Sequence, residues 1–335
     1  MKQIPLHFIH CSTRSGSTML VQMLNQNENV ISTSEEQFLI EFYHCYKNKK
    51  KWSRSDIEKF IKEFWHLSKK NPEFFFISKK ELANKLNESS QNLPFWKLIQ
   101  IIYSSYFPFM EKKQIEAIVD KQVWYVHQWD RINTITPESR HLILIRDFKD
   151  YLGSVKKRSM EDYGTIKSQA YVWALAYRRL YKIIQKNPKK TMVLHYEDLV
   201  KNPKTELKRV CYFFGINYSD NMLNFHVSHK KQIDNLPYDS KEFTFYKTIL
   251  SGLNEPLNDK NVGIGHSVLT EREVYLSENI CNSIAEKFDY KVTKNSNYLI
   301  KPFSLFYVYY QQVIKARLYF YFPVWLKIKL RKKQN

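Results

Sequence analysis

Residues 4–20 read IPLHFIHCSTRSGSTML, and this stretch decides the fold. Residues 4–11 are apolar and favour β structure, which predicts a buried strand. The turn STRSGST follows at once at 12–18, and MLVQMLNQ at 19–26 carries its apolar residues at helical spacing. A strand, a tight turn and a helix in direct succession form the first unit of a parallel α/β sheet.

The rest of the chain repeats this alternation. Apolar runs predict further strands at 30–32, 115–119, 141–145 and 191–195. Apolar spacing predicts helices at 54–69, 149–159, 166–186 and 203–214. On the long helix 166–186 we expect Tyr171, Leu175 and Leu180 on the inner face. The pattern predicts an α/β fold with a central parallel sheet, helices on both faces, and ligands at the carboxyl ends of the strands.

Composition sets limits on the class of protein. The chain has 335 residues, 43% of them hydrophobic, which suits one large α/β domain or two small ones. Its formal net charge of +20 indicates either a lysine-rich solvated surface or attraction to an anionic partner. The four cysteines lack zinc-ligand spacing, so we predict no metal site. Residues 4–11 are too short for a signal peptide and no long apolar run follows, so we expect a cytoplasmic location.

The turn after the first strand has the features of an anion site. Its backbone N–H groups converge at a helix N-terminus, and Arg14, Ser17 and Thr18 add a cation and two hydroxyls. An ordinary capped turn is the alternative. A kinase or GTPase loop is disfavoured, because position 11 is not glycine and no lysine follows Gly16.

A second anion motif follows the strand HLILI. Arg146 ends this strand, and Ser154 lies one to two turns into the next helix. Such a pair can converge on one phosphate, although a surface arginine and a solvated serine are the alternative. Because both motifs follow parallel strands, together they indicate a ligand that carries two anionic groups.

These motifs resemble those of sulfotransferases that use 3′-phosphoadenosine 5′-phosphosulfate (PAPS). TRSGSTML at 13–20 resembles the 5′-phosphosulfate loop of the branch with arginine, which includes bacterial and Golgi-type carbohydrate and protein-tyrosine sulfotransferases. RDFKDYLGS at 146–154 is similar to the family's 3′-phosphate motif, and VLHYEDLVKNPKTELKRVCYFFGI at 193–216 to its segment beside the adenine. Thr13 and Phe148 replace prolines that are usual in the family. The resemblance covers 4–37 and 117–290 and implies a P-loop-like fold of three layers.

The resemblance also implies which residues act. Adenosine 3′,5′-bisphosphate (PAP) is the implied product, and no metal is required. Arg14 would stabilise the leaving phosphate, Lys121 would assist at the sulfuryl group or only pair with Asp120, and Glu35 or Glu36 would be the base. The residues implied at the nucleotide are Arg14, Ser15, Gly16, Ser17, Thr18, Met19, Arg146, Ser154, Tyr196, Lys260 and Asn261. A plain solvent-exposed loop is the alternative for 260–261.

The chain divides into a predicted sulfotransferase domain at 1–296, with a variable helical insertion at 40–115 on the acceptor side, and a tail at 297–335. The tail is aromatic, basic and nearly free of acids. It is interpreted either as an interfacial segment on an anionic membrane, at the inner face, or as a docked helix. The acceptor, through a hydroxyl or amine, is expected to be a glycan, a lipid-linked glycan or a peptide.

Two other functions compete with this one. A P-loop nucleotide kinase shares the architecture but needs the glycine and lysine that are missing here. A polyanion-binding module would suit the charge. No nucleic-acid partner is expected, because repeated basic and aromatic motifs are absent from the sequence outside the tail.

Overall fold

All five predicted strands lie in one parallel sheet in the computed structural model. The model describes residues 3–34, 38–68, 77–106, 112–123, 125–158, 164–234, 241–244, 247–248, 250–292 and 302–332. The strands are β1 (Leu6–Cys11), β2 (Val30–Ser34), β3 (Ala117–Gln122), β4 (His141–Ile145) and β5 (Thr191–His195). Their order is β2-β3-β1-β4-β5, and every pairing is parallel. This confirms the predicted α/β fold.

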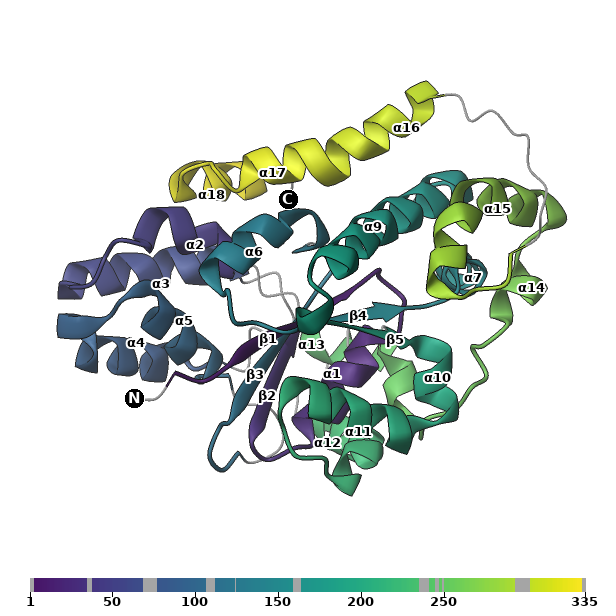
Figure 1. The fold of residues 1–335 in the computed structure, drawn as a ribbon. Coiled ribbons are helices and arrows are strands. Elements are labelled where there is room, and N and C mark those ends of the chain that lie inside the picture. Colours follow the sequence, from purple (N-terminus) through teal and green to yellow (C-terminus); the bar gives the residue numbers. More distant parts are fainter. Residues whose placement is uncertain are drawn as a thin grey trace.

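Helices cover both faces of the sheet (Figure 1). On one face pack α1 (Ser17–Asn25), α10 (Tyr196–Lys201), α11 (Pro203–Phe214) and α12 (Phe225–Asp234). On the other face pack α6 (Trp129–Ile135), α7 (Phe148–Arg158), α9 (Ile166–Lys186) and α15 (Glu271–Ala285). Since successive residues of a strand point to opposite faces, Leu144 packs under the first layer and Ile143 and Ile145 under the second.

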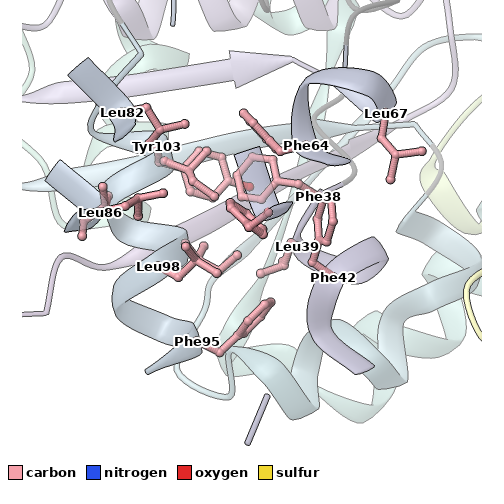
Figure 2. Packing of buried hydrophobic residues seen from close by; sticks show 14 of the residues in the cluster. Phe38, Leu39, Phe42, Phe64, Leu67, Leu82, Leu86, Phe95, Leu98 and Tyr103 are labelled. Atoms are coloured by element: carbon pink, nitrogen blue, oxygen red, sulfur yellow. The ribbon is translucent and has the colours of Figure 1, made fainter. Parts of the chain in front are cut away.

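The stretch predicted as a helical insertion contains an aromatic core of its own. Its helices are α2 (Phe38–Tyr46), α3 (Arg54–Ser68), α4 (Lys79–Glu88) and α5 (Phe95–Tyr103). Phe38 contacts Phe64 edge to face at 5.6 Å and Tyr103 at 4.7 Å between ring centroids (Figure 2). Phe8 and Ile118 of the sheet belong to the same cluster, so the insertion is packed against the sheet that holds the anion motifs.

The C-terminal tail runs along the outside of the layer formed by α6 and α9 (Figure 1). It consists of α16 (Pro302–Tyr309), a π-helical segment (Tyr310–Lys315), α17 (Ala316–Tyr319) and α18 (Val324–Lys332). Phe320 and Val324 are buried in the cluster of α2–α5, which fixes the tail to the domain. Within the described part of the chain, helices long and apolar enough to cross a membrane are lacking.

The remaining elements are short. They are α13 (Lys241–Thr244), α14 (Ile264–Val268) and 3-10 turns at Ser90–Asn92, Tyr125–Gln128, Pro188–Lys190, Asp220–Asn224, Ser251–Asn254 and Glu286–Phe288. One sequence prediction about packing is wrong in part. Leu180 of α9 is buried and Tyr171 packs half-buried against the same core cluster, as predicted. Leu175 instead lines the cavity beside the tail, and Trp173 and Tyr177 are buried on the inner face.

Candidate functional site

The loop between β1 and α1 has an unusual backbone. Gly16 has φ 79° directly before the first residue of α1, and Arg14 has φ 61°. A left-handed conformation is costly for arginine, and such strain is typical of functional loops. No side chain in the described residues caps this end of α1, so its first N–H groups and its dipole are available to an anion.

The two anion motifs meet directly. Arg14 Nε donates to Ser154 Oγ at 3.2 Å, and an Arg146 Nη donates to the backbone oxygen of Arg14 at 2.9 Å. The strand order explains this contact, because β1 and β4 are neighbours and both motifs follow their carboxyl ends. The structure therefore brings Arg14, Arg146 and Ser154 together, as the sequence predicts.

Tyr196 completes this group from the end of β5. The guanidinium of Arg146 lies 4.7 Å from the centre of the Tyr196 ring, a cation–π contact. The other Arg146 Nη donates to the backbone oxygen of Asn261 at 2.6 Å. Burial raises the pKa of the Tyr196 hydroxyl, although the Arg146 charge acts in the opposite direction, so the phenol is neutral at physiological pH.

Gly16 is required by the position of Tyr196. A Cβ added at Gly16 would lie 2.5 Å from Cδ2 of the tyrosine ring, and the positive φ already disfavours any other residue. The tyrosine is buried, so its ring has little room to retreat. The glycine of the loop therefore lets the loop and the aromatic ring share one wall of the site.

These residues line a pocket of about 420 Å³, a volume suited to a nucleotide. The lining is cationic and hydroxylic. It consists of Arg14, Gly16, Ser17, Thr18, Met19, Arg146, Ser154, Arg158, Tyr196, Thr248, Leu250, Ser251, Gly252, Leu253 and Asn261. No carboxylate is among the described residues that line the pocket, and three arginines are. The pocket can hold a ligand with more than one anionic group.

Part of this lining lies outside the motifs that the sequence showed. Arg158 lies one helical turn beyond Ser154 on α7, a spacing that could have identified it. Residues 250–253 come from a stretch without a motif, and only the fold brings them to the pocket.

Asp150 is a second omission. Its carboxylate accepts the backbone N–H groups of Gly263 at 2.7 Å and Gly265 at 2.9 Å. It thus fixes the segment that carries Asn261 onto α7.

The other predicted residues lie around the pocket. Met19 lines it, whereas Ser15 is fully buried beneath the loop. Lys260 is exposed, and its ammonium lies 3.7 Å from the Glu255 carboxylate. The roles proposed for these side chains stay predictions.

Lys121 is buried on β3 beside the end of β2. In the strand register it pairs with Ser34 on one side and Ile9 on the other. Glu35 and Glu36 follow Ser34 in the chain but lie outside the described residues. Lys121 therefore sits next to the strand that leads into the predicted base, and it does not line the pocket.

Asp120, next to Lys121, is fully buried on the opposite face of the sheet. It accepts hydrogen bonds from Tyr103 at 2.7 Å and Thr33 at 3.2 Å. Burial outweighs these bonds and raises the pKa of the Asp120 carboxyl to about 8. Clusters of three or more potential metal ligands do not occur among the residues that the structure describes.

Fold and pocket together define a nucleotide-handling α/β protein whose binding site lies at the carboxyl edge of a parallel sheet. The chain belongs to the sulfotransferase family, whose model matches residues 5–220. This confirms the family and the class of enzyme that the motifs predicted, and it favours neither the kinase nor the polyanion-binding alternative.

Individual relatives are distant. A protein of Caenorhabditis briggsae named "Putative protein-tyrosine sulfotransferase" is 25% identical over 107 residues, which is 31% of this chain and 38% of that protein. The match therefore spans well under two thirds of this curated relative.

Solved structures are similar in fold. The sulfotransferase domain of the Synechococcus PCC 7002 olefin synthase has a TM-score of 0.54 and 16% identity, over 88% of this chain and 98% of that domain. The sulfotransferase domain of the curacin biosynthetic pathway has a TM-score of 0.49 and 17% identity, over 87% of this chain and 100% of that one. The first of these likenesses supports the P-loop-like α/β fold.

Proposed function

We propose that this protein transfers a sulfuryl group from PAPS to a hydroxyl or amine of an acceptor and releases PAP. The observation that carries the proposal is the contact between Arg14, Ser154 and Arg146 in one pocket free of described carboxylates. PAPS carries anionic groups on both its 5′ and 3′ sides, and the pocket offers a cationic group from each of two strand ends.

The residues would divide between the two ends of the nucleotide. The N-terminus of α1, with Arg14, Ser17 and Thr18, would hold the 5′-phosphosulfate. Arg146 and Ser154 would hold the 3′-phosphate, with Arg158 adding a cation on the same helix as Ser154. Tyr196 would contact the adenine.

The proposed reaction is an in-line displacement at sulfur. The acceptor oxygen or nitrogen forms a bond to sulfur as the bond between sulfur and the phosphate oxygen breaks, and the electron pair of that bond stays on the phosphate. Arg14 would stabilise this developing charge. The acceptor proton would pass to Glu35 or Glu36, with Lys121 near the sulfuryl group. We expect no divalent metal to be needed, because the leaving phosphate is already a stable anion.

For the acceptor we propose a glycan, either free or lipid-linked, bound on the side of α2–α5. The excess of basic residues supports an anionic or membrane-associated acceptor. A tyrosine-containing peptide is the second candidate, favoured by the name of the curated relative. We also propose a cytoplasmic location, which suits a chain whose described cysteines form no disulfide.

Thermal unfolding with added nucleotides tests the donor. PAP should stabilise the protein more than adenosine 5′-monophosphate or adenosine 3′-monophosphate, because only PAP engages both motifs. At a PAP concentration of about 100 times Kd the gain in stability should be about 2.7 kcal/mol. Equal stabilisation by ATP with Mg²⁺, or by an oligonucleotide, would contradict the proposal. Transfer of radiolabelled sulfate from PAPS to a cell-envelope extract, compared with tyrosine peptides, would then identify the acceptor class.

A further inference from the structure

A second cationic pocket lies between α9 and the C-terminal tail. It has a volume of about 280 Å³ and shares no lining residue with the nucleotide pocket. Its lining residues are His127, Leu175, Arg178, Arg179, Lys182, Tyr309, Val313 and Arg317. Four of these carry permanent positive charges, and none of the lining residues in the described chain is acidic.

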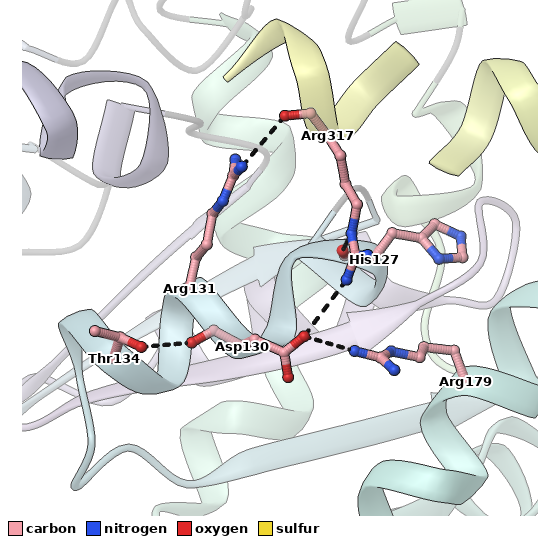
Figure 3. A network of polar contacts seen from close by, with 6 residues as sticks. All are labelled: His127, Asp130, Arg131, Thr134, Arg179 and Arg317. Atoms are coloured by element: carbon pink, nitrogen blue, oxygen red, sulfur yellow. Dashed lines mark hydrogen bonds and ion pairs between the residues drawn. The ribbon is translucent and has the colours of Figure 1, made fainter. Parts of the chain in front are cut away.

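The carboxylate of Asp130, beside the pocket, holds two of the four cationic side chains in place (Figure 3). Asp130 Oδ2 accepts from Arg179 at 2.9 Å and from Arg317 at 3.4 Å. Arg317 Nε also donates to the backbone oxygen of His127 at 3.2 Å, which ties the tail to the domain. Among the described residues, the one carboxylate that pairs with this group of four cations is shared by two arginines, so the group keeps a net positive charge.

His127 is neutral in this environment. Burial, and then the charges of Arg179 and Arg317, lower the pKa of its imidazole to about 4. The histidine therefore adds no positive charge at physiological pH, and the excess charge belongs to the arginines and Lys182.

The tail is fixed on one side and exposed on the other. Lys327 is fully buried, and its Nζ donates to the backbone oxygens of Glu41 at 2.9 Å and Phe320 at 3.2 Å. By contrast, Phe306, Tyr307 and Leu318 are 61%, 66% and 52% exposed. Other large exposed side chains of the tail are Tyr309, Tyr310, Tyr321, Trp325 and Leu330. Large exposed apolar and aromatic groups of this kind mark an interaction surface.

Tyr309 joins this exposed surface to the cationic pocket, because it lines the pocket and is itself 38% exposed. Residues 302–332 contain no aspartate or glutamate, so the surface carries no acidic side chain of its own. Aromatic side chains beside a group of arginines and lysines are complementary to the boundary between acyl chains and anionic headgroups.

We propose that the tail docks on an anionic phospholipid membrane, with its exposed aromatic side chains at the acyl boundary and a lipid headgroup phosphate in the pocket between α9 and α17. The membrane is favoured over a soluble polyanion because the same tail that contributes Tyr309 and Arg317 to the pocket also exposes Phe306, Tyr307 and Leu318, which need an apolar partner. The docking does not depend on sulfuryl transfer, because the pocket and the nucleotide site have no residue in common.

Co-sedimentation with vesicles tests the proposal. The full chain should bind vesicles of phosphatidylcholine mixed with phosphatidylglycerol more tightly than vesicles of phosphatidylcholine alone. Arg178→Gln with Lys182→Gln should weaken binding to the mixed vesicles about tenfold or more and reduce the difference between the two vesicles. Phe306→Ala with Leu318→Ala should weaken binding to both.

Matched control variants lie on the opposite helical layer, on α10 and α11. Lys201→Gln with Lys208→Gln removes the same charge, and Tyr212→Ala removes an aromatic side chain that is 87% exposed. These variants should bind vesicles like the unchanged chain, and thermal unfolding should show that all variants fold. The proposal is wrong if the controls weaken binding equally, if phosphatidylglycerol has no effect, or if an oligonucleotide binds the pocket in preference to vesicles. PAP binding should stay unchanged throughout, which separates this test from that of the donor site.

Discussion

Arg146 connects three parts of the nucleotide pocket. Its guanidinium bonds the backbone oxygens of Arg14 and Asn261 and stacks on Tyr196. Lysine has no planar pair of donors, so Arg146→Lys should lose at least one of these contacts. Loss of about 1.5–3 kcal/mol of binding free energy would weaken PAP binding about 10- to 150-fold, which isothermal titration measures. Arg140→Lys is the control, because Arg140 bonds Phe213 away from the pocket; unchanged PAP affinity in the Arg146 variant would contradict its role.

Gly16 allows a second test with single residues. Gly16 and Gly263 both have positive φ, at 79° and 81°, but only at Gly16 would a Cβ collide with Tyr196. Gly263→Ala should therefore cost about 1–2 kcal/mol of folding free energy for the backbone alone. Gly16→Ala should carry a similar cost and also displace the tyrosine, so PAP affinity should fall more than tenfold. Similar PAP affinities for the two variants would show that the Tyr196 contact is unimportant.

Single residues could be predicted from sequence where a motif fixed their spacing. Arg14, Arg146 and Tyr196 follow the ends of three strands and Ser154 lies in the helix after one of them, so neighbouring strands bring these residues together. Asp150 is harder to find, because its partners are backbone N–H groups more than one hundred residues away. Almost every residue has a backbone N–H group, so the sequence does not indicate which ones bond Asp150. Only the fold reveals this contact.

Among the elements, α14 lies unusually close to α7. A Cβ added at Gly265 would lie 2.4 Å from the backbone of Lys149, so α14 can contact α7 only through a glycine. Asp150 of α7 stabilises this contact, because its carboxylate accepts a hydrogen bond from the backbone N–H of Gly265 in α14. Asp150→Asn should lose one of the two N–H bonds, lower the stability by about 1–3 kcal/mol and weaken PAP binding through the displaced Asn261.

Asp259→Asn is the control for this prediction, since it removes an exposed charge from the same loop. Thermal unfolding and PAP titration measure both variants. A PAP affinity in Asp150→Asn equal to that of the control would show that the loop does not depend on the carboxylate.

The bounds of helices and strands could be predicted from the sequence more reliably than the side of a helix that faces the core. The strands at 141–145 and 191–195 and the helix at 166–186 have the predicted bounds. The inner face of α9 was partly wrong, because this helix contacts the sheet on one side, α15 on a second and α16 on a third. A helix with several neighbours buries more than one row of side chains, so the spacing of its apolar residues alone does not identify the face that packs on the sheet.

Across the whole molecule, the docking of the tail was the feature that sequence left open. Composition left both a membrane segment and a docked helix open, because aromatic residues serve both. The structure contains the docked arrangement, with a fully buried Lys327 whose charge is met by backbone oxygens. Buried lysines are rare, so periodicity alone would have placed this residue on the outer face.

The buried titratable groups predict how stability depends on pH. Burial lowers the pKa of four histidines below the ordinary value of 6.5. The pKa is about 4 for His7 and His127 and about 3 for His10, and it lies well below the ordinary value for His141. Below about pH 6.5 the unfolded chain therefore binds more protons than the folded chain, so stability should fall as the pH decreases towards 4. Chemical unfolding at a series of pH values measures this fall, and a constant stability from pH 6.5 to 5 would contradict it.

Asp120 has the opposite effect above that range. Its folded pKa of about 8 exceeds its ordinary value of 3.8, so the folded state keeps a proton that the unfolded chain releases. The contribution of Asp120 to stability should therefore fall as the pH rises from 6.5 to 8, by at most about 1.4 kcal/mol per pH unit. The histidines contribute in the opposite direction in this range, as does Lys112, because burial lowers the pKa of its ammonium to about 7. Asp120→Asn cannot titrate, so the free energy of unfolding of the unchanged chain minus that of this variant should decrease as the pH rises from 6.5 to 8, while the loss of stability below pH 6.5, which belongs to the histidines, remains in both. A difference that stays constant between pH 6.5 and 8 would show that Asp120 is ionised in the folded protein and that its bonds from Tyr103 and Thr33 outweigh its burial.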